Sequence, residues 1–365
     1  MPIDAAVFRK VHENLTIEAI DIDRPQPREV LVRTVATGVC HSDLHVVDGN
    51  GRFPLDRPIV LGHEGAGIVE AVGDAVTSVR VGDHVVACLS GFCGQCQECL
   101  SGHPNLCTGG FVARAPGAPP RLSQHGQPVR QFINISSYAE KMLLHENSLV
   151  RIDPDLPLDR AALVGCGVLT GVGAALRSSG LQAGQTVAVF GCGGVGLAII
   201  QGARIGGARR IIAVDQFAQK EEMAKRAGAT DFVNATEDDP VKAVRALTGG
   251  AGVDHAFEAV GLATLCRQAI ESLAIRGTAT IVGVLPPDAT IEFPWMAIRP
   301  ECRVQTSRMG GNRFRYDIPM YLDFYRQGRL DLDFMVTKRG RLGDINDAFR
   351  AMKAGEVART VLTFD

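Results

Sequence analysis

The sequence lacks an excess of charge of either sign, because 38 basic residues stand against 40 acidic ones and the net charge is −2. It also lacks a long basic run or a basic stripe, which nucleic acids and anionic membranes would require. These absences argue against nucleic-acid binding and against membrane-surface binding. A small, neutral or weakly charged partner fits this composition better.

Long apolar runs are missing as well. No run reaches the length of a membrane span, and the N-terminal segment MPIDAAVFRKVHENL has no uninterrupted apolar core for secretion. We therefore expect a cytoplasmic protein with no membrane partner. With 365 residues the chain exceeds what one hydrophobic core usually serves, so we expect two domains.

The most informative stretch runs from Val187 to Asp215. Its apolar segments predict a buried strand, a helix packed on a sheet and a second buried strand. Between the first strand and the helix lie three glycines with the spacing G-x-G-x-x-G, namely Gly191, Gly193 and Gly196. This context is the one that a dinucleotide-binding turn requires, and an ordinary glycine-rich turn is the alternative.

Each glycine has a mechanical role in such a turn. Gly191 makes the tight turn, Gly193 lets the backbone approach a pyrophosphate, and Gly196 lets the helix pack closely on the strand. The diphosphate would lie at the helix N-terminus, where free N–H groups and the helix dipole favour an anion, and we count Val195 there among the cofactor-binding residues. Asp215 would accept ribose hydroxyls and repel a 2′-phosphate, which predicts NAD rather than NADP.

The remainder of the chain divides by pattern. Residues 1 to about 90 contain short strand-like runs separated by Pro, Gly and Asp, and the segment 109–131, rich in proline and glycine, is expected to be an irregular loop. From residue 187 to about 305, strands and helices alternate, which predicts the doubly wound parallel sheet of an α/β protein. The tail is expected to form two amphipathic helices and a closing strand, at 316–327, 345–353 and 360–364.

Ten cysteines in a chain expected in a reducing compartment indicate metal binding or catalysis before disulfides. Thiolates at C-x-x-C spacing bind one ion from a tight turn, and a fourth thiolate completes a closed, structural zinc site. Disulfides, an iron–sulfur cluster and coincidental free thiols are the alternatives. The cysteines with this spacing are Cys93, Cys96, Cys99 and Cys107. Those in apolar surroundings, expected to be buried small side chains, are Cys88, Cys192, Cys266 and Cys302.

Three isolated segments supply ligands for a second metal site. They contain two thiolates, Cys40 and Cys166, and one imidazole, His63. A set of this kind leaves the fourth position of Zn²⁺ open for water or substrate. Sequence separation alone does not establish that the three residues converge, and each taken singly is more often a core residue than a ligand.

In the order of these motifs the chain resembles the medium-chain, zinc-dependent alcohol dehydrogenases, close to the class that includes glutathione-dependent formaldehyde dehydrogenase. The resemblance extends over essentially the whole length. It implies a Rossmann domain at 167–308 and a β-rich, GroES-like catalytic domain at 1–166, completed by 309–365. The motifs that carry it are GVCHSDLH at 38–45, GHEGAG at 62–67, the four-cysteine segment, GCGVLTG at 165–171, GCGGVG at 191–196 and ARTVLTF at 358–364.

The resemblance also implies roles for the residues around the catalytic zinc. Cys40, His63 and Cys166 would bind the ion, with Glu64 close behind it and Asp43 orienting the imidazole of His63.

A proton relay and four cofactor contacts follow from the same resemblance. Ser42 would take the proton of the alcohol and His45 would pass it to solvent, with a capping serine and a solvated histidine as the alternatives. The resemblance assigns Thr170 to the nicotinamide and Lys220 to the adenosine ribose. His41 and Arg359 are assigned to the pyrophosphate, and a merely solvated cation is the alternative for Lys220 and Arg359.

We therefore expect a homodimeric, NAD-dependent alcohol dehydrogenase with two zinc ions per subunit. A dehydrogenase of a thiol–formaldehyde adduct such as S-hydroxymethylglutathione, and a relative without catalysis, are the alternatives. Glutathione-dependent enzymes of the family carry an arginine four residues beyond the last cysteine of the zinc segment, where this chain has Phe111. The apolar ring favours an uncharged, hydrophobic primary alcohol, aromatic or medium-chain, unless Arg114 or Arg121 supplies the charge.

Overall fold

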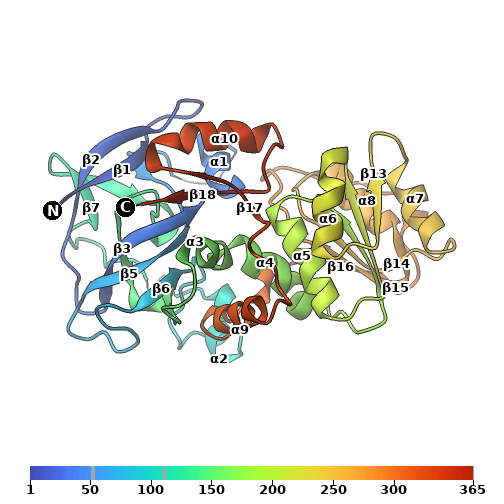
Figure 1. Ribbon diagram of the computed structural model, residues 1–365, viewed down its shortest axis with the longest axis horizontal. Helices are drawn as coiled ribbons and strands as arrows, with labels where there is room; N and C mark the ends of the chain where they lie inside the picture. The colour runs from blue at the N-terminus through green and yellow to red at the C-terminus, as the bar shows by residue number, and fades with distance from the viewer. Residues whose placement is uncertain (51–53, 110–111, 365) are drawn as a thin grey trace. The chain divides into compact units, whose positions relative to one another are not determined.

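The N-terminal part of the chain forms β-strands, as its short apolar runs between turn residues predict. The computed structural model describes residues 1–50, 54–109 and 112–364. Two compact units make up the chain (Figure 1). The first contains Met1–Cys166, Arg313–Phe324 and Val336–Asp365, and the second contains Gly167–Asn312 and Tyr325–Met335.

Five strands of the first unit close into a barrel in the order β1-β2-β7-β8-β4. Alternate residues of β1, namely Ile3, Ala5 and Val7, are buried in a core shared with the other strands, as the two-residue period of a strand requires. The bounds are β1 Pro2–Phe8, β2 Thr16–Ile22, β4 Ile59–Val60, β7 Leu122–Gln124 and β8 Gln127–Gln131.

The hairpin of β7 and β8 corrects the expectation of an irregular loop over 109–131. Its turn is made by His125 and Gly126, whose φ angles of 49° and 76° suit the tight turn of a hairpin. Strand β7 pairs with β2, and β8 pairs with β4. The sequence hides these strands because they are only three and five residues long, and their partners outside the hairpin, β2 and β4, lie far away along the chain.

A second sheet of the first unit has the order β10-β6-β5-β3-β18-β17, and β9 pairs with β3. Strand β18 runs antiparallel to β3, with Val361 opposite Gly38, so the C-terminal strand completes a sheet built mainly from the N-terminal part. The bounds are β3 Glu29–Gly38, β5 Glu64–Val72, β6 His84–Ala87, β9 Lys141–His145, β10 Leu149–Ile152, β17 Val336–Gly340 and β18 Arg359–Thr363.

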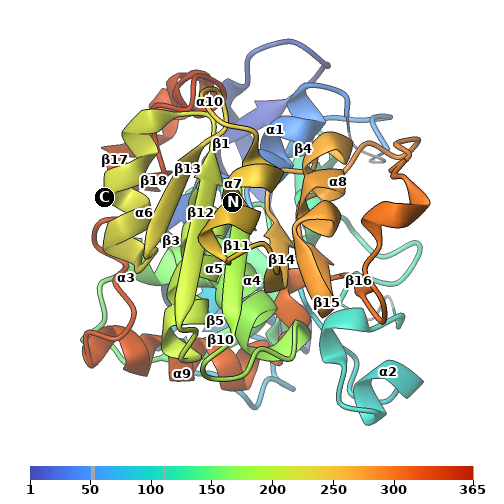
Figure 2. The ribbon, with the colours of Figure 1, turned by 90° about the vertical axis from the view of Figure 1, so that its right-hand side faces the viewer.

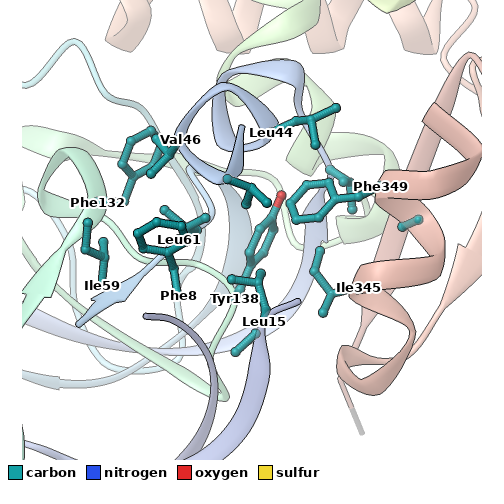
Figure 3. Close-up of a cluster of buried hydrophobic side chains, with 14 of the residues drawn as sticks. Phe8, Leu15, Leu44, Val46, Ile59, Leu61, Phe132, Tyr138, Ile345 and Phe349 are labelled. Carbon is teal, nitrogen blue, oxygen red and sulfur yellow. The ribbon is translucent and has the colours of Figure 1, made fainter. Parts of the chain in front are cut away.

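Helix α1, His41–Val47, was not anticipated, because seven residues are too few to display a helical period in an otherwise strand-rich region. Its apolar side chains pack with α10 around Tyr138 in one buried cluster (Figure 3). This packing fixes the position of α1 within the first unit. The other α-helices of this unit are α2 Gln97–Leu100, α3 Leu158–Ala161 and α10 Ile345–Lys353, and α9 Phe314–Arg326 belongs to it up to Phe324.

The second unit contains a six-stranded parallel sheet in the order β13-β12-β11-β14-β15-β16 (Figure 2). This order places the first and fourth strands side by side at the centre, which is the arrangement of a Rossmann sheet. The predicted fold class is thereby confirmed. The bounds are β11 Thr186–Phe190, β12 Arg210–Asp215, β13 Asp231–Asn234, β14 Val253–Glu258, β15 Leu273–Ile281 and β16 Arg303–Thr306.

Helices cover this sheet on both faces. Helix α5 packs beside α6, and α7 packs beside α8. Val244 of α7 and Ala269 of α8 share a core with alternate residues of β11, among them Ala188 and Phe190. The remaining residues of the same strand are also fully buried, as a doubly wound sheet requires. The helices are α4 Gly167–Gly173, α5 Gly194–Ile205, α6 Glu221–Ala227, α7 Pro240–Leu247 and α8 Ala263–Glu271.

The segments 309–312 and Tyr325–Met335 belong to the second unit, whereas 309–365 as a whole was expected to complete the first. The side-chain amide of Gln201 in α5 explains the difference for the second segment, because it donates to the carbonyl oxygen of Asp331 and accepts from its N–H. Among the described residues, no single helix is long and apolar enough to cross a membrane. One bent pair of helices, Leu158–Gly165 with Gly167–Ser178, has the length and composition of a membrane span, and these are the only two properties that suggest one.

Candidate metal and cofactor sites

The four clustered cysteines of the first unit bring their sulfur atoms together. The Sγ–Sγ distances are 3.9 Å for Cys93–Cys99, 3.5 Å for Cys96–Cys99 and 3.8 Å for Cys96–Cys107. A tetrahedral zinc ion with Zn–S bonds of about 2.3 Å needs sulfur atoms about 3.8 Å apart. The cysteines are free thiols, so no disulfide competes, and the donor set fits one ion.

Backbone N–H groups point at these sulfur atoms. Those of Cys96 and Gln95 donate to Cys93 at 3.3 and 3.5 Å, and that of Gly109 donates to Cys107 at 3.4 Å. Such hydrogen bonds favour the ionised form, and the N–H groups of Cys99 and Thr108 lower the pKa of Cys96 to about 6. Burial instead raises the pKa of Cys99 to about 12, so a metal ion must displace a proton there.

The second cluster consists of Cys40, His63, Glu64 and Cys166, all buried, with one ligand atom of each lying within 4.8 Å of the others. Cys40 precedes α1, His63 precedes β5, and Cys166 follows α3, so segments remote in sequence converge here. The Nε2 atom of His63 is fully buried and has no hydrogen-bond partner among the described residues. A buried, unpartnered nitrogen beside two sulfur atoms is what a Cys₂His zinc site provides.

Asp43 holds the other nitrogen of this imidazole. Its Oδ1 atom lies 3.2 Å from Nδ1 of His63 and also accepts the N–H of Gly62 at 2.8 Å. With Nδ1–H donated to the carboxylate, Nε2 is the nitrogen left for a metal. Asp43 and His63 are both fully buried, so neither interaction is screened by water.

Protons are unevenly distributed over the ligand set. The hydrogen bond from Cys166 lowers the pKa of Cys40 well below its usual value, and the same bond raises the pKa of Cys166. Burial lowers the pKa of His63, but the charges of Asp43 and Cys40 outweigh it and raise the pKa to about 10. A dication with three basic ligands would replace these protons.

Glu64 and Arg359 form a buried ion pair, in which Nη2 of Arg359 donates to Oε2 of Glu64. Arg359 is 5% exposed and lies at the start of β18. The structure shows Arg359 paired with Glu64, and its contact with a pyrophosphate remains a prediction. The Sγ atom of Cys40 lies 3.8 Å from the Oγ atom of Ser42, whose side chain is half-buried.

The glycine turn of the second unit has the geometry of a dinucleotide site. Gly191 has a φ of 95°, and a Cβ atom on Gly196 would lie 1.8 Å from the carbonyl oxygen of Gly191. A Cβ on Gly193 would meet no protein atom within 4 Å, so the space in front of the N-terminus of α5 is open. Val195 lies in the first turn of that helix, and the arrangement fits a pyrophosphate.

Asp215 ends β12 beside this turn. Its Oδ2 atom accepts the N–H of Cys192 at 2.7 Å and lies 3.1 Å from Nζ of Lys220, while Oδ1 accepts the N–H of Phe217 at 3.1 Å. The carboxylate is thus fixed next to the glycine turn. Thr170 of α4 donates to Sδ of Met309 at 3.4 Å in the same unit, and His41, the first residue of α1, is exposed.

Comparison with known proteins agrees with this geometry. Residues 26–154 match the family described as "Alcohol dehydrogenase GroES-like domain", and residues 194–326 match "Zinc-binding dehydrogenase". An S-(hydroxymethyl)glutathione dehydrogenase of Haemophilus influenzae is 39% identical over 99% of this chain and 97% of that protein. The chain belongs to the zinc-dependent alcohol dehydrogenase family.

Two solved structures resemble the whole chain. An alcohol dehydrogenase zinc-binding domain protein from Burkholderia ambifaria has a TM-score of 0.93 at 37% identity, over 100% of this chain and 99% of that one. Benzyl alcohol dehydrogenase from Acinetobacter calcoaceticus has a TM-score of 0.91 at 33% identity, over 100% of both chains.

These findings confirm several predictions made from the sequence. The protein is a zinc-dependent alcohol dehydrogenase that uses NAD, and its fold combines a GroES-like part with a Rossmann sheet. The expectation that four cysteines are buried small side chains holds for Cys88, Cys192 and Cys266, whereas Cys302 is half-buried. Phe111 lies outside the described residues.

The first prediction separates the two metal sites. We expect Cys96→Ser to lose one zinc and to lower the melting temperature, because a closed site stabilises the fold. His63→Ala should lose the other zinc, stay folded and bind NAD. Its activity should fall at least about 1,000-fold, since Lewis-acid assistance contributes several kcal/mol. The measurements are elemental analysis, melting and NADH formation, with Cys302→Ser as control. Two zinc ions retained in either ligand variant would contradict the assignment.

The second prediction concerns NAD preference. Asp215→Asn keeps the volume of the side chain but removes the charge, so the KM for NAD should rise about 10-fold or more, as the loss of charged hydrogen bonds to ribose hydroxyls implies. The preference over NADP should narrow because the repulsion of a 2′-phosphate disappears. Steady-state kinetics with both cofactors test this, and Asp238→Asn, an exposed acid beyond β13, is the control. Equal use of NADP by the unsubstituted enzyme would refute the assignment.

Proposed function

We propose that the enzyme oxidises an uncharged, apolar primary alcohol, aromatic or medium-chain, to its aldehyde. The observation that carries this proposal is that Arg114 and Arg121 both pair with carboxylates of the protein itself. Arg114 donates to Glu29 at 2.6 and 2.9 Å and to Asp23 at 2.6 Å, and Arg121 donates to Glu29 at 2.7 Å.

Both guanidinium groups are already neutralised inside the protein. The side chains of Arg114 and Arg121 are 7% and 5% exposed, and the side chain of Glu29, which pairs with both, is 4% exposed. A substrate carboxylate would have to displace a buried one, at a cost of several kcal/mol for each broken charge pair. Phe111 stands in the sequence where glutathione-dependent enzymes carry an arginine, so this position adds no positive charge.

The likeness to benzyl alcohol dehydrogenase supports an aromatic alcohol as substrate. A thiol–formaldehyde adduct is the second candidate, because relatives at 39% identity are named S-(hydroxymethyl)glutathione dehydrogenase. The two candidates differ in charge, since the glutathione adduct carries carboxylates and benzyl alcohol carries none. Substrate charge is therefore the property to test.

In the proposed mechanism Cys40, His63 and Cys166 hold the catalytic zinc, and Cys93, Cys96, Cys99 and Cys107 hold the structural one. Zinc and NAD, when bound, supply Lewis acidity towards the alcohol oxygen and a hydride acceptor. Asp43 would keep Nε2 of His63 free for the metal, and the pair of Glu64 and Arg359 would add a compensated charge beside the ligand set.

Proton removal is assigned to α1. Ser42 and His45 are three residues apart on this helix, so they share a face, and both are half-buried. Asp43 is fully buried and serves His63 instead. Ser42 accepts the proton of the alcohol, and His45 passes it to solvent, a transfer for which an imidazole is suited near neutral pH.

The third prediction tests the substrate. We expect kcat/KM for benzyl alcohol or octanol to exceed that for S-hydroxymethylglutathione. Phe111→Ala should lower kcat/KM for the apolar alcohols by about 1–3 kcal/mol, or 5- to 150-fold. Phe111→Arg should raise kcat/KM for the thiol adduct and lower it for benzyl alcohol. Preference of the unsubstituted enzyme for the adduct would favour the second candidate.

The fourth prediction tests the relay. Ser42→Ala should lower kcat for alcohol oxidation about 100-fold or more, the contribution typical of acid–base catalysis. His45→Ala should cost far less, because water can replace a terminal proton carrier. Ser42→Thr retains the hydroxyl and should recover much of the activity. Negligible losses in both alanine variants would remove the two residues from the mechanism.

We also propose that the subunits form a homodimer through the second unit. Strand β16 pairs with β15 on one side, and no other described strand pairs with it. Near it in sequence, Trp295 and Met296 are 81% and 84% exposed, and Val304 of β16 is 49% exposed. An open edge strand with exposed large apolar residues is a surface suited to pairing with a second copy.

The fifth prediction is that Trp295→Glu yields a monomer in sedimentation velocity at concentrations where the unsubstituted enzyme is a dimer. A charge in an apolar interface is costly, whereas Val81→Glu, at a 60% exposed position of the first unit, should leave the dimer intact. Since Trp295 is the single tryptophan, its emission should shift to the red on dilution. A dimeric Trp295→Glu variant would argue against this surface.

We further propose a cytoplasmic location. All ten cysteines are free thiols, which a reducing compartment maintains. Recovery of the enzyme in the membrane or secreted fraction of cells would contradict this location.

A further inference from the structure

Tyr138 carries a hydroxyl group in an otherwise apolar cluster. Its ring is fully buried among Phe8, Leu61 and Phe349, and it meets the Phe349 ring edge-on at a centroid distance of 6.3 Å (Figure 3). A phenylalanine would fill the same space without an oxygen atom to satisfy. The tyrosine hydroxyl therefore requires an explanation beyond packing.

The hydroxyl donates a hydrogen bond to the Oδ2 atom of Asp43 at 2.9 Å. Burial, together with the charge of Asp43, raises the pKa of Tyr138 well above its usual value, so the group remains a donor. In Figure 3 the hydroxyl oxygen points from the cluster towards α1, the helix that carries Asp43.

This hydrogen bond completes the coordination of a buried carboxylate. Oδ1 of Asp43 accepts the N–H of Gly62 and faces Nδ1 of His63, while Oδ2 is taken by Tyr138. With both oxygen atoms held, the carboxylate cannot turn about its last side-chain bond. The direction in which it holds the imidazole is thereby fixed.

The backbone places Tyr138 against the same ligand segment. The N–H of Tyr138 donates to the carbonyl oxygen of Leu61, and that of Ser137 donates to Gly62. Gly62 has a φ of 88°, and a Cβ atom there would lie 2.5 Å from Cδ1 of the Tyr138 ring. The glycine before His63 thus allows the ring to approach closely enough for its hydroxyl to reach Asp43.

We propose that Tyr138 is a positioning residue of the catalytic metal site, acting through Asp43 on the orientation and tautomer of His63. The inference rests on the proposed zinc set of Cys40, His63 and Cys166. Loss of a direct partner of a metal-bound histidine typically weakens metal binding 10- to 100-fold. Because Tyr138 lies one hydrogen bond further away, we expect a smaller effect, about 3- to 10-fold.

The test is Tyr138→Phe in the zinc-loaded enzyme. Retention of the catalytic zinc against a competing chelator should fall about 3- to 10-fold, while the four-cysteine zinc is retained. The absorption bands of the cobalt-substituted enzyme should change, because the imidazole is no longer held in one orientation. Unchanged zinc retention together with an unchanged cobalt spectrum would overturn the inference.

Two variants separate this role from a purely structural one. Phe349→Leu disturbs the packing around the ring but leaves the hydroxyl, so it should lower the melting temperature without changing zinc retention. Tyr321→Phe removes another fully buried phenolic hydroxyl, on α9, and should leave the cobalt spectrum unchanged. If either control reproduced the effect of Tyr138→Phe on zinc, the inference would fail.

Asp43→Asn supplies the second line of evidence. If Tyr138 acts through this carboxylate, Asp43→Asn alone should weaken zinc retention, and adding Tyr138→Phe should cost less than it does in the unsubstituted enzyme. Full additivity of the two losses in zinc retention would refute the coupling. This comparison remains valid if Tyr138→Phe also lowers the stability of the fold.

His63→Ala distinguishes a failure of the proposed zinc site from a failure of the role of Tyr138. If that variant keeps both zinc ions, the proposed zinc site is wrong; if it loses one while Tyr138→Phe loses none, only the role of Tyr138 is wrong.

Discussion

The buried ligand set of Cys40, His63 and Cys166 in the first unit depends on one buried carboxylate. Asp43 has no exposed surface, so its charge must be satisfied by the groups that surround it. Its partners, Gly62, His63 and Tyr138, come from two segments remote from α1. Removing one partner of a buried charge typically costs about 3–5 kcal/mol. The same interaction that places the imidazole therefore also joins three parts of the chain.

The two candidate metal sites differ in how the charge of neighbouring thiolates is offset. In the four-cysteine cluster, the sulfur atoms are partly exposed and backbone N–H groups offset their charge. In the second site, the ligands are buried and Glu64 brings another negative charge, which Arg359 balances. The cluster is closed by its fourth sulfur, so it suits a structural ion. The other set has three basic ligands, which would leave a fourth position of a zinc ion open.

Much of this arrangement was accessible from the sequence where the signal is local. The glycine turn, Asp215 and the cysteine spacing are local patterns, and the structure has the strand, turn and helix that they predict. Helix α1 was missed because it is short, and β7 and β8 were missed because they are short and their partners outside the hairpin are remote. Tyr138 gave no signal, since an aromatic residue near a strand is usually part of the core. The role of Asp43 came from the family resemblance, because its partner is 20 residues away.

The charges in the segment after the four-cysteine cluster show again that the sequence does not reveal partners remote along the chain. In the sequence, Arg114 and Arg121 are two cations available to attract a substrate carboxylate. No residue next to them in sequence indicates that they are already paired. Both side chains pair with Glu29, at the start of β3, which is 85 residues before Arg114 and 92 before Arg121, and Arg114 also pairs with Asp23. Because Glu29 is the first residue of β3, its backbone is held by the pairing of this strand with β9. The charge available to a substrate in this segment is thus set by a framework residue, and a change at position 111 acts on a background that is already neutral.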